Sequence, residues 1–158
     1  MPNALTLRLD AIQPDQMAQL AVALGAALTA GNTILLSGEI GAGKTFFARA
    51  LIQSRLPTPE DVPSPSFTLV QTYQTQSGEI WHADLYRIST PGEIEELGLS
   101  DAFETSICLI EWPDRMGDAV PSDALFLHFD LGEDESDRQM TFKWNPDHWA
   151  KILKIAVE

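Results

Sequence analysis

Residues 38–45 read Gly-Glu-Ile-Gly-Ala-Gly-Lys-Thr and fit the pattern G-x-x-x-x-G-K-[ST]. A largely apolar run at 33–37 precedes them, and a helical pattern at 44–56 follows. Glycines let successive backbone N–H groups point inward, and the start of a helix adds unpaired N–H groups and the positive end of its dipole. The stretch therefore predicts a strand, a phosphate-binding loop and a helix.

Two side chains of this loop are of the kinds that a bound nucleotide requires. Lys44 is expected to bridge the β- and γ-phosphates as a mobile point charge. Thr45 is expected to offer its hydroxyl to a Mg²⁺ held between the same phosphates. The residues predicted to bind the phosphates are Gly38, Glu39, Ile40, Gly41, Ala42, Gly43, Lys44 and Thr45.

Length and composition narrow the class of protein. A chain of 158 residues is the size of one domain, so we expect a single domain over 1–158. It has no apolar run long enough to span a bilayer, and its first residues lack a basic segment followed by an apolar one. Cys108 is the only cysteine, so no internal disulfide is possible. We expect a soluble, cytoplasmic protein without a membrane partner.

The net charge of −13 bears on possible partners. Nucleic acid is a polyanion whose binding depends on neutralising its phosphates, so direct binding of RNA or DNA is disfavoured. Any role close to a nucleic acid is expected to pass through another protein.

The order of the apolar patterns predicts an α/β domain with a mixed sheet, in which a parallel core and antiparallel hairpins are flanked by helices. Residues 57–67 hold four prolines and predict a surface connection. Helices are expected from Pro14 to about Gly31, at 44–56, at 91–99 and after Asn145–Pro146. Strands are expected at 5–9, 33–37, 67–73, 79–85, 107–112, 125–129 and 139–144.

This predicted arrangement makes two carboxylates candidates for the site. Glu111 ends a buried, parallel strand, and active sites of open α/β sheets lie at that edge, so it is expected to hold Mg²⁺ directly or through water. A role as a helix cap or surface acid stays open. Asp84 lies on the same face of its strand as His82 and Tyr86 and is a candidate to orient a metal-bound or attacking water. His82 by itself is better explained as a hydrogen-bonded structural residue.

The proline-rich connection carries two further candidates. Ser64 and Ser66 follow the phosphate-loop helix, and in nucleotide switches a loop at this place can sense the γ-phosphate and its Mg²⁺ through a hydroxyl. An ordinary Ser-Pro turn is the competing interpretation. Trp112 is expected beside the site, although packing explains it equally well.

Four blocks together resemble the bacterial TsaE family, also called YjeE, and they lie in family order at 38–45, 64–67, 82–87 and 109–115. The phosphate loop alone names only a superfamily; the H-x-D-L-Y-R and I-E-W blocks make the resemblance specific. Ser66 stands where the family usually has threonine, and Asp114 where glutamate is usual. Both changes keep the chemical group.

The resemblance implies a variant of the P-loop NTPase fold and an ATPase that binds ATP and Mg²⁺. It also implies association with the TsaD–TsaB pair and ATP hydrolysis that resets that complex between rounds of tRNA N6-threonylcarbamoyladenosine modification, with tRNA contacted only through the partners. By position, Lys44 and Asp84 are the catalytic residues, and Thr45 and Glu111 the metal ligands. Besides the loop, the nucleotide-binding residues are Ser66, Trp112 and Arg138.

Two other functions remain open at this point. A small-molecule kinase on the same scaffold commonly needs extra arginines, and only Arg87, Arg115 and Arg138 follow the phosphate-loop helix. A nucleotide-gated binding module that never hydrolyses its ligand differs only in turnover. Guanine specificity is disfavoured because no N-K-x-D signature is present.

Overall fold

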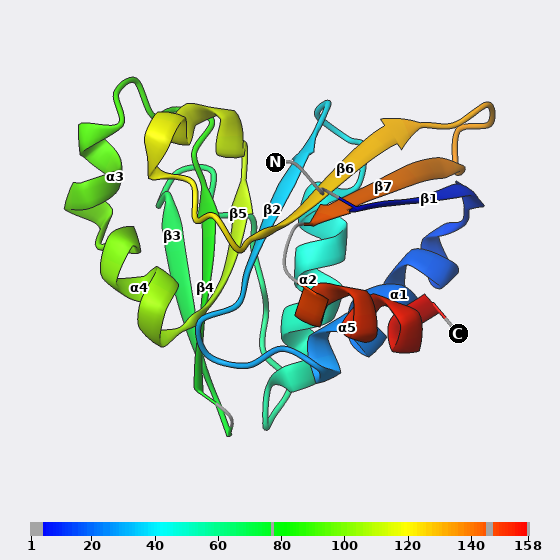
Figure 1. Ribbon diagram of the computed structural model, residues 1–158, viewed down its shortest axis with the longest axis horizontal. Coiled ribbons are helices and arrows are strands. Elements are labelled where there is room, and N and C mark those ends of the chain that lie inside the picture. The colour runs from blue at the N-terminus through cyan, green and yellow to red at the C-terminus, as the bar shows by residue number, and fades with distance from the viewer. Residues whose placement is uncertain (1–4, 77, 145–146, 158) are drawn as a thin grey trace.

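The computed structural model describes residues 5–76, 78–144 and 147–157. Within these residues, seven strands form one sheet in the order β1-β7-β6-β2-β5-β4-β3 (Figure 1). Strands β6, β2, β5 and β4 run parallel, whereas β3, β7 and β1 pair antiparallel with their neighbours. The strands are β1 (Leu5–Ile12), β2 (Thr33–Gly38), β3 (Val70–Thr75), β4 (Gly78–Asp84), β5 (Ile107–Glu111), β6 (Leu125–Leu131) and β7 (Arg138–Trp144). The predicted mixed sheet, with a parallel core and antiparallel strands outside it, is confirmed.

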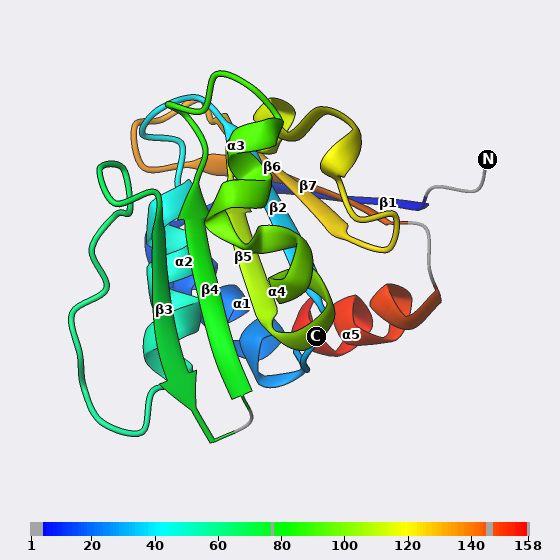
Figure 2. The same cartoon turned by 90° about the vertical axis from the view of Figure 1, so that its left-hand side faces the viewer.

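Helices cover both faces of this sheet, as Figures 1 and 2 show. On one face lie α1 (Pro14–Ala26), α2 (Lys44–Arg55) and α5 (Asp147–Val157), and on the other lie α3 (Gly92–Leu97) and α4 (Leu99–Thr105). A 3₁₀ helix, η1 (Pro113–Ala119), follows β5. None of the described helices combines the length and the apolar character needed to cross a membrane.

The core has two parts, one on each side of the sheet. Below α1, α2 and α5 the rings of Phe47 and Phe129 meet edge to face with centroids 5.7 Å apart, and the same part of the core includes the buried Trp149. Below α3 and α4 the core includes Leu35, Cys108 and Ile110. Every residue of β5 is buried, because a central parallel strand is covered on both faces.

The carboxyl ends of three parallel strands meet at one edge of the sheet. Strand β2 ends at Gly38, where the phosphate loop begins. Strand β5 lies between β2 and β4, and its last residue, Glu111, pairs with Leu36 on one side and with Asp84 on the other. The register therefore places both predicted carboxylates beside the loop.

Several boundaries differ from the predictions. The strand expected from Phe67 begins only at Val70, because the backbone N–H of Leu69 donates to the carbonyl of Pro65 at 2.7 Å and closes a turn. Helix α1 ends at Ala26 instead of near Gly31, since Ala27 and Leu28 N–H groups bond three residues back and tighten the last turn.

Strand β1 is longer than predicted. It continues to Ile12, which pairs with Arg138 after a shift in register. The predicted cap Asn145–Pro146 and the turn residue Ser77 lie outside the described residues.

Candidate active site

The backbone of the phosphate loop needs glycine at three positions. Gly38, Gly41 and Gly43 have φ angles of 139°, 83° and 123°, which side chains of L-residues rarely allow. At Gly38 a Cβ atom would also lie 2.5 Å from the carbonyl oxygen of Phe129. The loop and strand β6 therefore approach each other only because this position has no side chain. Helix α2 begins at Lys44, as predicted.

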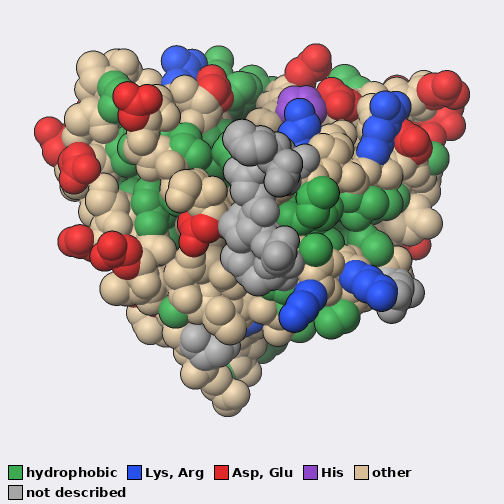
Figure 3. All heavy atoms as spheres, in the orientation of Figure 1, with side chains coloured by type: hydrophobic (Ala, Val, Ile, Leu, Met, Phe, Trp, Pro, Cys, Tyr) green, Lys and Arg blue, Asp and Glu red, His purple; other side chains and the backbone are tan. Residues whose placement is uncertain are grey.

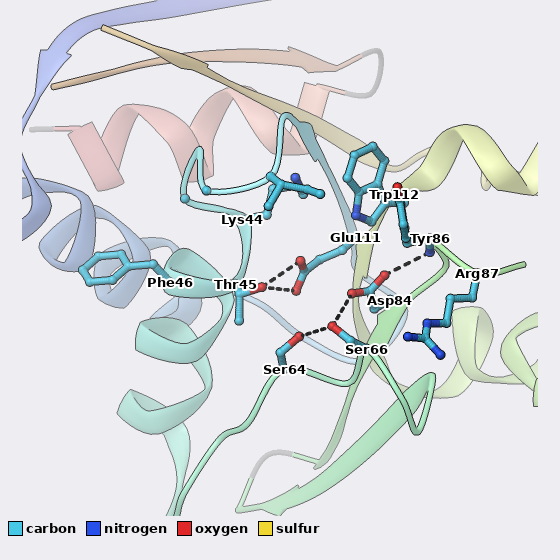
Figure 4. A pocket seen from close by; sticks show the side chains of 13 residues that line it. Lys44, Thr45, Phe46, Ser64, Ser66, Asp84, Tyr86, Arg87, Glu111 and Trp112 are labelled. Carbon is cyan, nitrogen blue, oxygen red and sulfur yellow. Dashed lines mark hydrogen bonds between the residues drawn. The ribbon is translucent and has the colours of Figure 1, made fainter. Parts of the chain in front are cut away.

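An open cavity of about 400 Å³ lies in front of the loop, at the carboxyl ends of β2, β4 and β5 (Figure 4). Side chains from the loop, the proline-rich connection, the end of β4 and the end of β5 converge on it. The lining residues are Ile40, Gly41, Gly43, Lys44, Thr45, Phe46, Ser64, Ser66, Asp84, Tyr86, Arg87, Glu111 and Trp112.

Lys44 is folded onto the loop that precedes it. Its Nζ donates to the carbonyl oxygens of Gly38 and of Glu39, the latter at 3.0 Å, and lies 4.3 Å from the centroid of the Trp112 ring. Burial lowers the pKa of the Lys44 ammonium, while the carboxylates of Glu111, Asp84 and Asp114 act in the opposite direction. An anion bound in front of the loop would add to these stabilising charges.

Glu111 is buried, and two side chains satisfy its carboxylate. The hydroxyl of Thr45 donates to both oxygens, at 2.9 and 3.0 Å. On the other side Nε2 of His82 lies 2.7 Å from Oε2 of Glu111 and is the donor if the carboxylate is ionised. His82 is fully buried, and its Nδ1 has no hydrogen-bond partner among the described residues. Thr45, Glu111 and His82 thus form one chain of hydrogen bonds.

Asp84 ends a second chain, which comes from the proline-rich connection. The Oγ atoms of Ser64 and Ser66 are 2.7 Å apart, and Ser66 donates to Oδ2 of Asp84 at 3.2 Å (Figure 4). The other oxygen of Asp84 accepts the backbone N–H of Tyr86 at 2.9 Å. The connection at 57–67 is therefore tied to the cavity through a hydroxyl, the residue type that the sequence predicted for this place.

Trp112 closes the cavity on the side of Lys44. It has φ and ψ angles of 61° and 54°, a left-handed conformation that is uncommon for a residue other than glycine. Its ring centroid lies 4.8 Å from that of Tyr86. Strain of this kind is often found at functional sites, and here it turns the ring over the ammonium group of Lys44.

Arg138 lies on the far side of the loop. Its guanidinium donates to the carbonyl oxygens of Ala42 at 3.1 Å and Gly41 at 3.2 Å. It lines a second hollow of about 340 Å³ together with Pro14, Met17 and Phe46. The structure thus places Arg138 against the phosphate loop but outside the main cavity.

The structure gathers most, but not all, of the predicted residues in the main cavity. Ile40, Gly41, Gly43, Lys44, Thr45, Ser66, Asp84, Glu111 and Trp112 line it, whereas Gly38, Glu39, Ala42 and Arg138 do not. The sequence prediction named none of Phe46, Tyr86 and Arg87 as a site residue. The alternation along β4 put Tyr86 on the face of Asp84, and this was the signal that could have found it. The interpretation of His82 as a hydrogen-bonded structural residue agrees with its buried contact to Glu111.

The donor set fits a hard divalent cation. No group of three or more His, Cys, Asp or Glu side chains in the described part of the chain could hold a metal by itself. The Thr45 hydroxyl and the Glu111 carboxylate supply only oxygen donors. Mg²⁺ prefers oxygen and usually takes its remaining ligands from water and substrate phosphates, so these residues suit it better than a metal held entirely by protein.

This arrangement can bind a polyphosphate and direct water at its end. The loop offers backbone N–H groups, the start of α2 offers a positive dipole, and Lys44 offers a charge. The carboxylates of Asp84 and Glu111, each at most 6% exposed, lie at the ends of adjacent strands in front of the loop.

Comparisons with known proteins agree with the pattern of motifs. The family model described as "Threonylcarbamoyl adenosine biosynthesis protein TsaE" matches residues 11–140. A Rickettsia bellii protein named tRNA threonylcarbamoyladenosine biosynthesis protein TsaE is 39% identical over 115 residues, which cover 73% of this chain and 80% of that protein. A Rickettsia felis protein of the same name is 42% identical over 98 residues, which cover 62% of this chain and 57% of that protein.

Among solved structures, the crystal structure of Bacillus subtilis YdiB superimposes on this chain with a TM-score of 0.80. The superposition covers 99% of this chain and 97% of YdiB at 22% sequence identity. At that identity the likeness establishes a common fold.

Proposed function

This chain belongs to the TsaE family of tRNA threonylcarbamoyladenosine biosynthesis proteins, and on that premise we propose that it is an ATPase that drives this modification together with partner proteins. The observation that carries the proposal is the bond from Thr45 to Glu111, formed directly in front of the phosphate loop and within the same cavity as Lys44. A hydroxyl paired with a carboxylate at this place is the arrangement that holds Mg²⁺ in P-loop NTPases.

In the proposed reaction each side chain has one task. The loop amides and Lys44 bind the phosphates, for which Lys44 leaves the carbonyl oxygens that it contacts here. Thr45 and Glu111 would hold Mg²⁺, which would neutralise phosphate charge when bound. Asp84 accepts a hydrogen bond from the attacking water, and Ser66 keeps the Asp84 carboxylate in place.

We assign the base of the nucleotide to the second hollow. It adjoins Gly41 and Gly43, so a nucleotide whose phosphates lie on the loop can reach it. Pro14, Met17 and Phe46 give it an apolar lining that suits the faces of a purine. Arg138 fixes the loop between the two hollows through the carbonyl oxygens of Gly41 and Ala42. Adenine is the base that the resemblance to the TsaE family implies.

Partners enter the proposal because the surface is acidic. On the face shown in Figure 3, acidic side chains gather over α3 and α4 and around the β6–β7 end of the sheet. With a net charge of −13, such a protein approaches tRNA best through other proteins, and the TsaD–TsaB pair is the partner that we propose. The proposal takes residues 1–158 as one domain, because β1 and β7, which are the first and last strands along the described chain, pair in the same sheet. It also places this domain in the cytoplasm.

ATP turnover with and without the TsaD–TsaB pair tests the proposal. We expect slow hydrolysis by the protein alone and faster hydrolysis with the pair. Asp84→Asn should still bind ATP in calorimetry but hydrolyse it about 100-fold more slowly, because the base for water is lost. Lys44→Ala should lose both ATP binding and the tRNA modification.

Three results would contradict this function. Absence of stimulation by the pair, with Lys44→Ala still supporting modification, would remove the ATPase role. Phosphoryl transfer to a small molecule instead of water would identify a kinase. ATP binding without any hydrolysis, even with partners, would identify a nucleotide-gated module.

A further inference from the structure

Arg87 is a basic residue of the main cavity that none of the roles above uses. It follows β4 by three positions, lines the cavity and is exposed. Its guanidinium carbon lies 4.5 Å from the centroid of the Phe67 ring. Within the described part of the chain it makes no hydrogen bond and no ion pair, although the protein has 23 acidic residues. All N–H donors of this guanidinium are therefore free for a ligand.

The charges around the cavity show where such a donor is needed. Lys44 and Arg87 are the two basic residues in the lining. Lys44 lies at the base of the loop under Trp112, and in the view of Figure 4 Arg87 lies on the other side of Asp84 and Glu111. A phosphoryl group in front of the loop is therefore flanked by carboxylates. On the side away from Lys44, Arg87 is the only cation that the described residues contribute to the lining.

The contact with the Phe67 ring can hold the Arg87 guanidinium in place while its N–H groups stay available for other hydrogen bonds. A ring face attracts the guanidinium through its quadrupole and leaves the N–H groups in the guanidinium plane free. Phe67 is 81% exposed, and it follows Ser66, whose hydroxyl bonds Asp84. Arg87 thus rests on the same connection that is tied to the proposed water-binding carboxylate.

We propose that Arg87 is a catalytic residue that donates hydrogen bonds to the γ-phosphoryl oxygens in the transition state of ATP hydrolysis. The inference rests on the proposed ATPase function. As the water oxygen bonds to the γ-phosphorus, the bond from that phosphorus to the bridging oxygen breaks. ADP keeps the electron pair, and the proton of the water passes to Asp84 or to the phosphate formed. Arg87 stabilises the negative charge that this step spreads over the phosphoryl oxygens.

A purely structural role predicts different behaviour. If Arg87 only covered the Phe67 ring, its removal would affect folding or loop order, and no soluble cation could replace it. If Arg87 contacts the transition state, its removal lowers kcat and leaves ATP binding nearly unchanged, because the interaction forms only during the chemical step.

The experiment compares three variants of the full chain, with the TsaD–TsaB pair present. Arg87→Ala should lower kcat about 100-fold while the Kd for ATP changes less than about threefold. Addition of guanidinium chloride should restore part of the activity of Arg87→Ala, and sodium chloride at equal ionic strength should not. The kcat of Arg87→Lys should lie between those of the wild-type protein and Arg87→Ala, because lysine keeps the charge but not the planar pair of donors.

Arg115→Ala is the matched control. Arg115 also lies over an aromatic ring, with its guanidinium carbon 5.7 Å from the Tyr86 centroid, but it does not line the cavity. Its variant should keep wild-type turnover. Wild-type kcat in Arg87→Ala, a loss of ATP binding that guanidinium does not rescue, or an equal loss in Arg115→Ala would overturn the inference. If the wild-type protein itself fails to hydrolyse ATP, the proposed function fails instead.

Discussion

The buried carboxylate of Glu111 is oriented by hydrogen bonds from two other residues of the site. It is 2% exposed, so its carboxylate requires hydrogen-bond donors in place of water. Thr45 and His82 supply them from two different elements. The hydrogen bond from His82 to Oε2 of Glu111 fixes the orientation of the carboxylate. It therefore determines the direction in which the other lone pairs of the carboxylate point. His82 is thus a positioning residue for the proposed metal ligand.

Removal of the His82 donor should therefore weaken use of Mg²⁺. We expect His82→Ala to lower Mg²⁺-dependent ATP hydrolysis by about 10- to 100-fold, as is typical when a partner of a metal ligand is lost. His82→Gln should retain much of the activity, because its amide keeps an N–H donor near Nε2. Titration of the hydrolysis rate with MgCl₂ measures both variants.

Two outcomes would count against this role of His82. One is an unchanged Mg²⁺ requirement in a folded His82→Ala protein. The other is an equal defect in His82→Gln, because the hydrogen bond would then not be the cause. Circular dichroism of both variants separates a loss of fold from a loss of metal use.

At the scale of elements, the junction of β2, the phosphate loop and β6 is packed too closely to accept an added side chain at Gly38. Gly38 has a φ of 139° and its Cα faces the carbonyl oxygen of Phe129, whereas Gly41 has a φ of 83° and open space around it. Both positions need glycine for the backbone, but only Gly38 needs it for packing as well. The difference makes the two glycines a matched pair.

Gly38→Ala should destabilise the protein more than Gly41→Ala. The first change adds a Cβ at 2.5 Å from a backbone oxygen, so β2 and β6 must separate, and we expect a loss of at least about 2 kcal/mol in the free energy of unfolding. The second adds only the strain of a left-handed residue, about 1 kcal/mol. Urea denaturation without nucleotide measures both, and equal losses would show that the close approach to β6 does not matter.

At the scale of the whole molecule, β5 joins the two parts of the core. Its residues alternate between them: Leu109 packs under α1 and α2, while Cys108 and Ile110 pack under α3 and α4. Burial raises the pKa of the Cys108 thiol to about 12 from an ordinary value of 9.0. The thiol is therefore a packing group in the folded protein and ionises readily only when the chain unfolds.

This pKa shift predicts how stability depends on pH. Because the folded pKa is raised, the stabilising effect of the protonated thiol is complete below about pH 9 and is lost as the pH rises toward 12. The difference in the free energy of unfolding between wild type and Cys108→Ala should shrink by about 1.5 kcal/mol from about pH 8 to about pH 10. Urea titrations at both pH values measure it. A constant difference would mean that the thiol ionises equally in both states.

The amino-acid sequence by itself determined the local parts of this protein. Spacing of apolar residues located all seven strands, although β3 began three residues later than expected, since a turn closed by Leu69 and Pro65 is not visible in hydrophobic periodicity. The phosphate loop and the carboxylates at the ends of β4 and β5 were equally readable. The strands, the phosphate loop and the positions of these carboxylates at strand ends depend on residues that are close in the chain. Sequence patterns show such local relations directly.

Only the tertiary structure decided which of these parts meet. The bond from Thr45 to Glu111 spans 66 positions, that from His82 to Glu111 spans 29, and that from Arg138 to Ala42 spans 96. The two contacts of Glu111 follow from the strand order, which puts β5 between β2 and β4, and from register, whereas the contact of Arg138 depends on β6 and β7 lying beside β2. A one-residue slip of β4 would turn His82 and Asp84 to the opposite face, so the site exists because long-range packing of the core fixes that register.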